Sequence, residues 1–163
     1  MIFFDFEVFR HDWLVVLANA NTQTFQPIIN DPDGLRRFYE KHKAEVWVGY
    51  NSRSYDQYIV KGILLDFNPY EVSKFIIAED RKGWEYSSAF AKIPLNVFDI
   101  MTTPHGLKQL EGFMGHDIRE SQVSFKTERK LTDPELQEVE AYCRHDVEQT
   151  MEVFMNRLDE FES

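Results

Sequence analysis

The order of apolar segments along the chain constrains its fold more than any other feature. Three short segments rich in strand-forming residues come first, at residues 2–8, 12–20 and 22–29. A short polar turn joins the second segment to the third, and strands joined in this way pair antiparallel. The sequence therefore predicts an antiparallel meander in the first part of the chain.

Helical patterns alternate with two further strand patterns in the rest of the chain. The additional strands are expected at residues 45–51 and 93–101. Helices are expected at residues 35–43, 54–65, 69–80, 105–115 and 132–161. A loop or weak hairpin is expected at residues 81–92, and irregular structure at residues 116–130. This order predicts an α/β domain with three layers, in which helices flank a mixed five-stranded sheet.

The composition fits one globular domain that spans residues 1–163. Hydrophobic residues make up 43% of the chain, and its 14 phenylalanines provide enough apolar bulk for a packed core. The formal net charge of -10 argues against a protein that binds bulk duplex DNA, because such proteins usually present a basic surface. An acidic chain can still act on nucleic acids when bound metal ions supply the positive charge.

Cysteine content and the distribution of apolar residues predict a cytoplasmic protein. Cys143 is the only cysteine, which excludes a disulfide within the chain and fits a reducing compartment. No apolar run reaches the roughly 18 residues that a membrane-spanning helix requires. The first residues lack the basic segment and the cleavage site of a signal peptide. We therefore expect a soluble, cytoplasmic protein without a membrane partner.

Two acidic residues, Asp5 and Glu7, interrupt the most apolar strand pattern in the sequence. Side chains alternate faces along a strand, so these two carboxyl groups point one way. The side chains that point the other way are Phe4, Phe6 and Val8. Two like charges on one face of an inner strand repel each other, and a divalent cation between them would remove that cost. The alternative is an edge strand whose two acids face water, and this pair alone leaves both interpretations open.

Asn51 and Asp56 follow the fourth predicted strand at the start of a predicted helix. In open α/β sheets, binding sites form in the crevice at the ends of the strands. Asp56 could therefore join Asp5 and Glu7 in one site. Taken alone, Asp56 is more typical of an acid that stabilises a helix start, and Asn51 of a turn residue.

The last predicted helix carries Tyr142 and Asp146, which are four residues apart and therefore lie on one face. The apolar stripe of this helix consists of Leu136, Val139, Cys143, Val147, Phe154 and Leu158. Tyr142 and Asp146 lie at the shoulder of that stripe, where a phenol and a carboxylate could overhang a cleft while the helix packs on the sheet. A half-buried tyrosine and a solvated aspartate are the simpler interpretation of the two residues in isolation.

Three segments, taken in order, resemble the DEDD superfamily of 3′–5′ exonucleases. They are Asp5-Phe-Glu7, Asn51-Ser-Arg-Ser-Tyr55-Asp56 and Tyr142-Cys-Arg-His-Asp146. The tyrosine of the third segment is typical of the tyrosine branch, which includes ribonuclease D and the proofreading domains of DNA polymerases. The histidine branch would carry histidine at the position of Ala141. The second and third segments look most like the proofreading domains of family B polymerases. With the strand that ends at Asp99 and the predicted helix at 105–115, the resemblance covers roughly residues 2–155.

The resemblance implies a ribonuclease H-like fold and a site for two divalent cations, Mg²⁺ or Mn²⁺. Asp5, Glu7 and Asp146 would bind the cations directly. Asp56 would hold the second cation partly through water, and Tyr142 would orient the attacking water molecule. Oxygen ligands of this kind suit hard divalent cations. The family therefore implies catalytic roles for all five residues.

The substrate that the family implies is the free 3′ end of single-stranded DNA, from which nucleoside monophosphates would be released, as in proofreading. Candidates for substrate contacts are Asn51, Tyr55 and Phe6. Basic side chains that could meet phosphates are Arg53, Lys108, Lys126, Arg129 and Lys130. An acidic module of this kind would suit a partner that delivers strand ends, such as a DNA polymerase or another replication protein. Two alternatives stay open: a 3′–5′ exoribonuclease, and a catalytically silent nucleic-acid-binding module of the same fold.

Overall fold

The computed structural model describes residues 1–102 and 121–156 of the chain. Its strands are β1 (Ile2–Val8), β2 (Trp13–Asn19), β3 (Thr24–Ile29), β4 (Val46–Gly49) and β5 (Asn96–Asp99). They form one five-stranded sheet in the order β3-β2-β1-β4-β5. β1, β2 and β3 pair antiparallel, as the predicted meander, whereas β4 pairs parallel with β1 and β5 pairs parallel with β4. The sheet is therefore mixed, as the sequence predicts.

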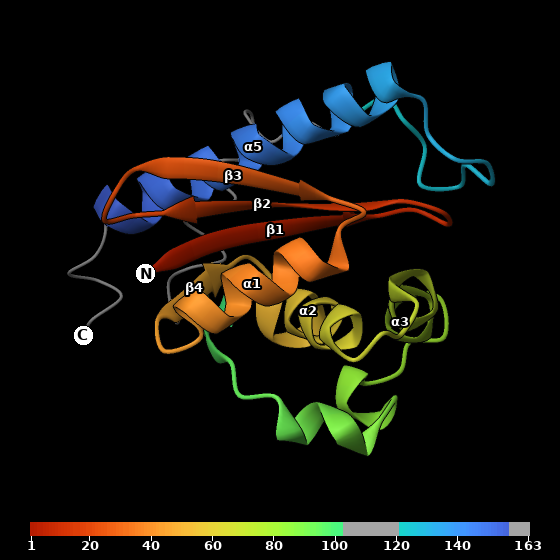
Figure 1. Cartoon of the computed structure of the whole chain (residues 1–163), viewed down its shortest axis with the longest axis horizontal. Coiled ribbons are helices and arrows are strands. Elements are labelled where there is room, and N and C mark those ends of the chain that lie inside the picture. Colours follow the sequence, from red (N-terminus) through yellow and green to blue (C-terminus); the bar gives the residue numbers. More distant parts are fainter. Residues whose placement is uncertain (103–120, 157–163) are drawn as a thin grey trace.

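Helices lie on both faces of this sheet. The α-helices are α1 (Pro32–His42), α2 (Gln57–Leu64), α3 (Pro69–Ile77) and α5 (Asp133–Asn156). A π-helical turn, η1 (Ser52–Asp56), precedes α2. Short 3₁₀ segments are η2 (Gly83–Glu85), η3 (Ser88–Lys92) and η4 (Ile100–Thr102). Figure 1 shows α5 on one face of the sheet and α1, α2 and α3 on the other. The predicted α/β arrangement, in which helices flank a mixed five-stranded sheet, is confirmed.

Helix α1 begins three residues earlier than the sequence predicts, at Pro32 instead of Leu35. The Asp31 side chain caps it by accepting a hydrogen bond from the Gly34 backbone N–H at 3.0 Å. Proline is tolerated in the first helical turn because the N–H that it lacks would have no partner inside the helix. A capping residue followed by proline is therefore a start signal that apolar periodicity does not reveal.

The hairpin predicted as one option for residues 81–92 is wrong, because this segment forms the turns η2 and η3. The rings of Tyr86 and Phe90 stack with centroids 6.0 Å apart, and both pack edge-on against Phe67. Gly83 lies against the Tyr58 ring, where an added Cβ would be 2.2 Å from a ring carbon. Packing of aromatic rings against the α2–α3 region therefore sets the conformation of this segment.

Part of the sequence prediction falls on residues outside the description. The predicted helix at 105–115 lies there, as do Lys108, Leu158 and the end of the last predicted helix beyond Asn156. Within the described part, residues 121–130 form turns and bends, as expected for an irregular segment.

The two faces of β1 contribute to two separate apolar cores. The face toward α1, α2 and α3 buries Phe4, Phe6 and Val8. The face toward α5 buries Phe3 and, just beyond the strand, Phe9. Asp5 and Glu7 alternate with the first set, so they share the α5 face. The acidic pair thus lies between the sheet and the last helix.

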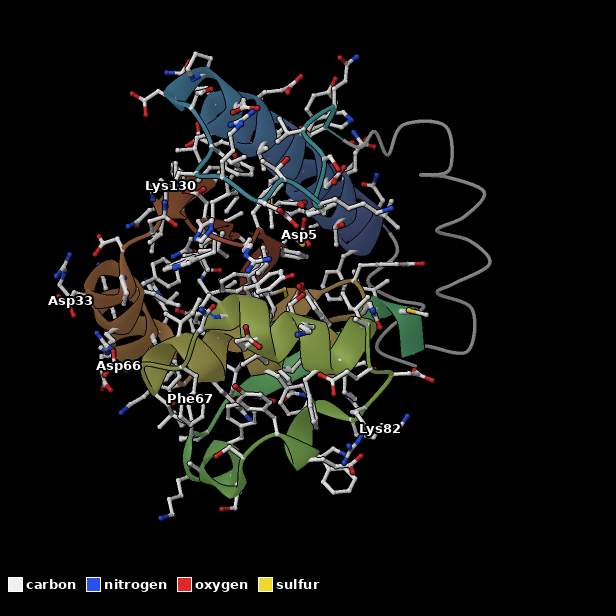
Figure 2. The ribbon with its side chains drawn as sticks, turned by 90° about the vertical axis from the view of Figure 1, so that its right-hand side faces the viewer. Asp5, Asp33, Asp66, Phe67, Lys82 and Lys130 are labelled. Atoms are coloured by element: carbon white, nitrogen blue, oxygen red, sulfur yellow. The ribbon has the colours of Figure 1, made fainter. Side chains whose placement is uncertain are left out.

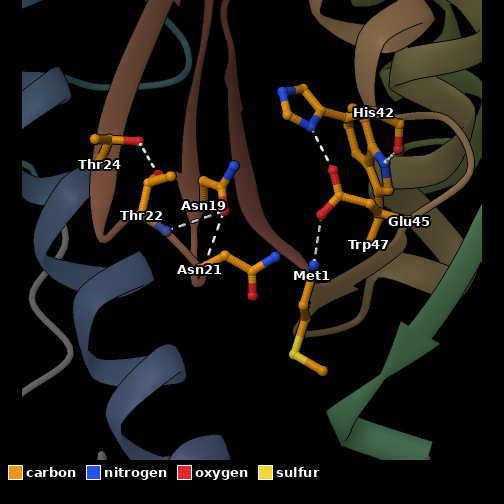
Figure 3. A network of polar contacts seen from close by, with 8 residues as sticks. All are labelled: Met1, Asn19, Asn21, Thr22, Thr24, His42, Glu45 and Trp47. Atoms are coloured by element: carbon orange, nitrogen blue, oxygen red, sulfur yellow. Dashed lines mark hydrogen bonds and ion pairs between the residues drawn. The ribbon is translucent and has the colours of Figure 1, made fainter.

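Polar contacts hold the amino ends of β1 and β4 together, as Figure 3 shows. Glu45 accepts a hydrogen bond from the Met1 amino group at 2.6 Å and contacts the His42 ring. The Trp47 indole N–H donates to the His42 backbone carbonyl at 3.0 Å. Asn19 closes the neighbouring β2–β3 turn by accepting hydrogen bonds from two backbone N–H groups. These contacts fix one end of the sheet, and the candidate site lies toward the other end of β1.

Candidate metal centre

The segments Asp5–Glu7, Asn51–Asp56 and Tyr142–Asp146 are called the first, second and third motif below. Strand β1 positions the two acidic residues of the first motif. It pairs with β2 from Ile2 to Val8, with Asp5 opposite Val16, and it pairs with β4 at its amino end. β1 is therefore an inner strand, and the alternative of an edge strand with two solvated acids is wrong. Figure 2 shows Asp5 inside the molecule, beside α5. Both acidic side chains are half-buried. Pairing with β2 along the whole of β1 makes the strand a rigid support for them.

Asp99 positions the segment that carries the second motif. Its side chain lies at the end of β5 and is 1% exposed. It accepts three backbone N–H hydrogen bonds, from Asn51 at 2.9 Å, Arg53 at 3.0 Å and Met101 at 3.0 Å. Asn51 has a left-handed φ of 58°, which asparagine adopts more readily than most residues. Because these bonds fix the start of η1, they also determine where Asp56, at its end, meets β1.

Asp56 is a buried carboxylate without a compensating donor. Its exposed fraction is 4%, and within residues 1–102 and 121–156 no group donates a hydrogen bond to its carboxylate. Burial, and then the negative charges of Asp5, Glu7 and Asp99, raise the pKa of Asp56 well above its ordinary value. Asp56 therefore lies near Asp5 and Glu7, as the contact between η1 and β1 also shows.

Asp5, Glu7 and Cys143 form a compact group between β1 and α5. Their potential ligand atoms all lie within 4.8 Å of one another. The Cys143 thiol donates to the Asp5 backbone carbonyl, with Sγ 3.3 Å from that oxygen and 3.6 Å from Asp5 Oδ2. Burial raises the pKa of Asp5 to about 6, although hydrogen bonds with Cys143 and Glu7 oppose this effect. Burial and the surrounding carboxylates also raise the pKa of the Cys143 thiol.

Helix α5 brings Asp146 to the same part of the molecule. Asp5 and Asp146 line one cavity of about 170 Å³ between β1 and α5. The charge of Asp146 also contributes to the raised pKa of Cys143, three residues before it. Tyr142 is half-buried on α5 and is not among the residues that line this cavity. The structure thus brings Asp146 to the first motif, whereas among the described residues Tyr142 forms no hydrogen bond with Asp5 or Glu7 and lines neither cavity that contains them.

A groove of about 500 Å³ lies at the carboxyl end of β1, and Glu7 forms part of its wall. Its aromatic lining consists of Phe6, Tyr55, Tyr70 and Phe125. Lys74 and Lys126 also line it. Phe125 is 51% exposed. The groove therefore presents ring faces and two cationic side chains next to the acidic group.

The structure places the three predicted substrate-contacting residues differently. Phe6 and Tyr55 line the groove, although the Phe6 ring is almost wholly buried at 4% exposure. The Tyr55 hydroxyl shares a hydrogen bond of 2.8 Å with Ser73, and burial raises its pKa. Asn51 is exposed and does not line the groove. Its backbone N–H donates a hydrogen bond to the Asp99 carboxylate. Asn51 thus has a clear local role in the turn.

The donors in this group fit a hard divalent cation. Buried carboxylates repel each other unless they are protonated or a cation offsets their charge. No Lys, Arg or His of the described residues forms an ion pair with Asp5 or Asp56. Carboxylate oxygens are the ligands that Mg²⁺, Mn²⁺ and Ca²⁺ prefer. The Asp5–Glu7–Cys143 group, with Asp56 beside it, could therefore hold a metal ion.

Sequence reasoning missed two contributors to this centre. Asp99 was recognised only as the end of a strand, yet an acid at the end of a parallel strand that neighbours β4 faces the same edge of the sheet as the second motif. Cys143 was assigned to the apolar stripe of the last helix, and no sequence pattern indicates that its thiol reaches Asp5. Only the docking of α5 on β1 brings those two residues together.

Comparison of the chain with protein-family models, with curated proteins and with solved structures finds no match. Among the helices of residues 1–102 and 121–156, none combines the length and the apolar character needed to cross a bilayer.

Proposed function

We propose that this protein is a metal-dependent 3′–5′ exonuclease of the DEDD superfamily, with a ribonuclease H-like fold, that acts on the 3′ end of single-stranded DNA. The observation that carries the proposal is the convergence of carboxylates from separate segments. Asp5 and Glu7 from β1 and Asp56 from η1 are close enough to affect each other's ionisation. Asp146 from α5 lines a cavity with Asp5.

In this proposal the residues that hold two divalent cations are Asp5, Glu7, Asp56 and Asp146. Cations held there would supply an activated water molecule and would stabilise the leaving 3′ oxygen. The contribution of the chain is to fix the ligands: β1 supports two of them rigidly, and Asp99 holds the turn that carries the third. Tyr142 would orient the attacking water, which requires its hydroxyl to approach the scissile phosphate when substrate is bound.

The groove beside Glu7 supports a single-stranded substrate. Bases stack on exposed aromatic faces without regard to sequence, and the exposed Phe125 ring offers such a face. Lys74 and Lys126 can contact phosphates along the same groove. The net charge of -10 predicts modest, salt-sensitive binding, which suits a module that receives strand ends from a DNA polymerase or another replication protein. RNA ends are the alternative substrate, because nothing in the groove lining distinguishes the 2′-hydroxyl.

The test is incubation with 5′-labelled DNA and RNA oligonucleotides, single- and double-stranded, in Mg²⁺, Mn²⁺ or chelator. We expect a ladder that shortens from the 3′ end, abolished by chelator and by Glu7→Gln. The matched control is Glu79→Gln, which removes an exposed glutamate two residues beyond the end of α3 that does not line the groove and should cleave as the unaltered protein does. Oligonucleotide binding without cleavage in either metal would instead indicate a silent nucleic-acid-binding module.

A further inference from the structure

The thiol of Cys143 lies among the candidate ligands for hard cations. Its Sγ is 3.6 Å from Asp5 Oδ2. One potential ligand atom from each of Asp5, Glu7 and Cys143 lies within 4.8 Å of the other two. Thiolate sulfur is a ligand for thiophilic cations such as Zn²⁺ and Cd²⁺ and a poor one for Mg²⁺. The same position in the fold therefore offers two different sets of donor atoms.

The separation between the sulfur and one Asp5 carboxylate oxygen equals that of two ligands on a tetrahedral zinc ion. A Zn–S bond of about 2.3 Å and a Zn–O bond of about 2.1 Å at the tetrahedral angle separate the two ligand atoms by about 3.6 Å. That is the separation between Cys143 Sγ and Asp5 Oδ2. Glu7 reaches the same centre by a change in its side-chain torsions, since each of its three torsions has alternative staggered states.

A second observation points to a cation at this position. Asp56 is 4% exposed, receives no hydrogen bond from the described residues, and lies on η1, which contacts β1, near enough to Asp5 and Glu7 for their charges to act on it. Among the described residues, no Lys, Arg or His forms an ion pair with this carboxylate. A divalent cation would supply the positive charge.

We propose that Asp5, Glu7 and Cys143 form a binding site for one thiophilic divalent cation, Zn²⁺ or Cd²⁺, distinct in its sulfur ligand from the all-oxygen site for Mg²⁺ or Mn²⁺. Binding replaces the S–H bond of Cys143 by a metal–sulfur bond, and the thiol proton passes to the buffer. The hydrogen bond from the thiol to the Asp5 carbonyl is lost in the same step. Because Asp5 and Glu7 serve both sites, the two kinds of cation exclude each other.

Cadmium titration tests this proposal directly, because a thiolate bound to Cd²⁺ or Co²⁺ gives a ligand-to-metal charge-transfer absorption band. Cys143 is the only cysteine in the chain, so any such band reports on this residue alone. We expect one Cd²⁺ per chain, a thiolate band that saturates with it, and release of one proton per cation. Absence of the band at saturating Cd²⁺, in folded protein that still binds Mn²⁺, would overturn the proposal.

Variants separate a three-ligand site from an isolated thiol. Cys143→Ser keeps a hydroxyl donor for the Asp5 carbonyl and should lose the band while its circular dichroism stays unchanged. Glu7→Gln keeps the cysteine, and should keep the band but lower the Cd²⁺ affinity at least tenfold. Glu79→Gln should leave the affinity unchanged. Equal Cd²⁺ affinities for Glu7→Gln and the unaltered protein would show that the thiol binds alone, which contradicts the proposed site.

Inhibition by zinc is the part of this inference that rests on the proposed nuclease function. Zn²⁺ should suppress Mg²⁺-supported cleavage, and excess Mg²⁺ should restore it. The two proposals fail separately. If the protein shows the thiolate band but does not cleave DNA, the cation site is supported and the proposed nuclease function is wrong. If the protein cleaves DNA but shows no thiolate band, the nuclease function is supported and the proposed site for a thiophilic cation is wrong.

Discussion

At the scale of single residues, the poorly solvated acids of the candidate centre make the fold less stable at neutral pH when no cation is present. Burial raises the pKa of Asp5 to about 6, above the ordinary value near 3.9. The folded protein therefore binds the Asp5 proton more tightly than the unfolded chain does. The free energy of unfolding must then fall as the pH rises from about 4 to about 6, and it stays lower above that range.

This reasoning predicts that Asp5→Asn is more stable than the unaltered protein at pH 7 in chelator, by roughly 2–3 kcal/mol. The advantage should shrink toward zero at pH 4, where Asp5 carries a proton. Urea denaturation at a series of pH values measures it. Asp80→Asn, which removes an exposed aspartate, is the matched control and should show little change. A stability difference that is the same at pH 4 and pH 7 would contradict the predicted ionisation of Asp5.

Asp99 acts as a positioning residue through three backbone hydrogen bonds. Replacement by alanine leaves three N–H groups in a largely buried turn without their acceptor, at a cost of roughly 1 kcal/mol or more each. We expect Asp99→Ala to lower the free energy of unfolding by about 3 kcal/mol and Asp99→Asn, which keeps one acceptor oxygen, by less. Thermal unfolding of both variants checks the order. Equal losses would mean that the carboxylate charge matters more than the hydrogen bonds.

At the scale of elements, docking of α5 on the sheet depends on a buried polar contact as well as on apolar packing. Asp12, 2% exposed at the start of β2, accepts hydrogen bonds from the Leu131 backbone N–H at 2.8 Å and the Asn30 amide at 2.8 Å. Lys130 adds an ion pair at 3.3 Å. Burial alone would raise the pKa of Asp12, but these hydrogen bonds together hold it below its usual range. The contact ties the residues before α5 to β2.

The lowered pKa of Asp12 determines how its contribution to the free energy of unfolding changes with pH. Its contribution to stability is complete above the ordinary pKa near 3.9 and is lost as the pH falls through the lower folded value. We therefore expect Asp12→Asn to be about 2 kcal/mol less stable than the unaltered protein at pH 7. The difference should narrow as the pH falls below the ordinary pKa near 3.9. Urea denaturation at pH 7 and at a series of acidic pH values measures it. A difference that widens in acid would show that Asp12 is not ionised in the fold.

The elements themselves differ in how far the sequence predicts them. The meander and the order of the later strands and helices follow from local apolar patterns, and the structure has this order within residues 1–102 and 121–156. The cap box of α5 is equally local: Thr132 N–H donates to Glu135 Oε1 at 2.9 Å and Glu135 N–H to Thr132 Oγ1 at 3.3 Å. The turn η1 is not local, because its start depends on Asp99 from a distant strand. The spacing of apolar residues along the sequence does not predict long-range contacts of this kind.

At the scale of the whole molecule, the candidate centre exists only because the fold collects segments that are far apart in sequence. Asp5, Asp56 and Asp146 come from β1, η1 and α5, and the predicted motifs named these residues without giving their distances. In the unfolded chain the three carboxylates are separated, so a cation that needs them together binds the folded state alone. Such binding stabilises the fold by RT ln(1 + [L]/Kd), about 2.7 kcal/mol at a hundredfold excess over Kd.

A variant at Asp56 tests how cation binding affects the stability of the fold. The Asp56 carboxylate is expected to destabilise the cation-free fold and to help bind the cation. Asp56→Asn removes a buried charge beside Asp5 and Glu7, so we expect its melting temperature to exceed that of the unaltered protein in chelator. In Mn²⁺ the order should reverse, since the variant gains less from the cation. Thermal unfolding of both proteins in both buffers gives the comparison, with Asp80→Asn expected to follow the unaltered protein throughout. An equal shift in the melting temperature of Asp56→Asn in chelator and in Mn²⁺ would show that the Asp56 carboxylate does not help to bind metal. The candidate metal centre would then consist of Asp5, Glu7 and Cys143 alone.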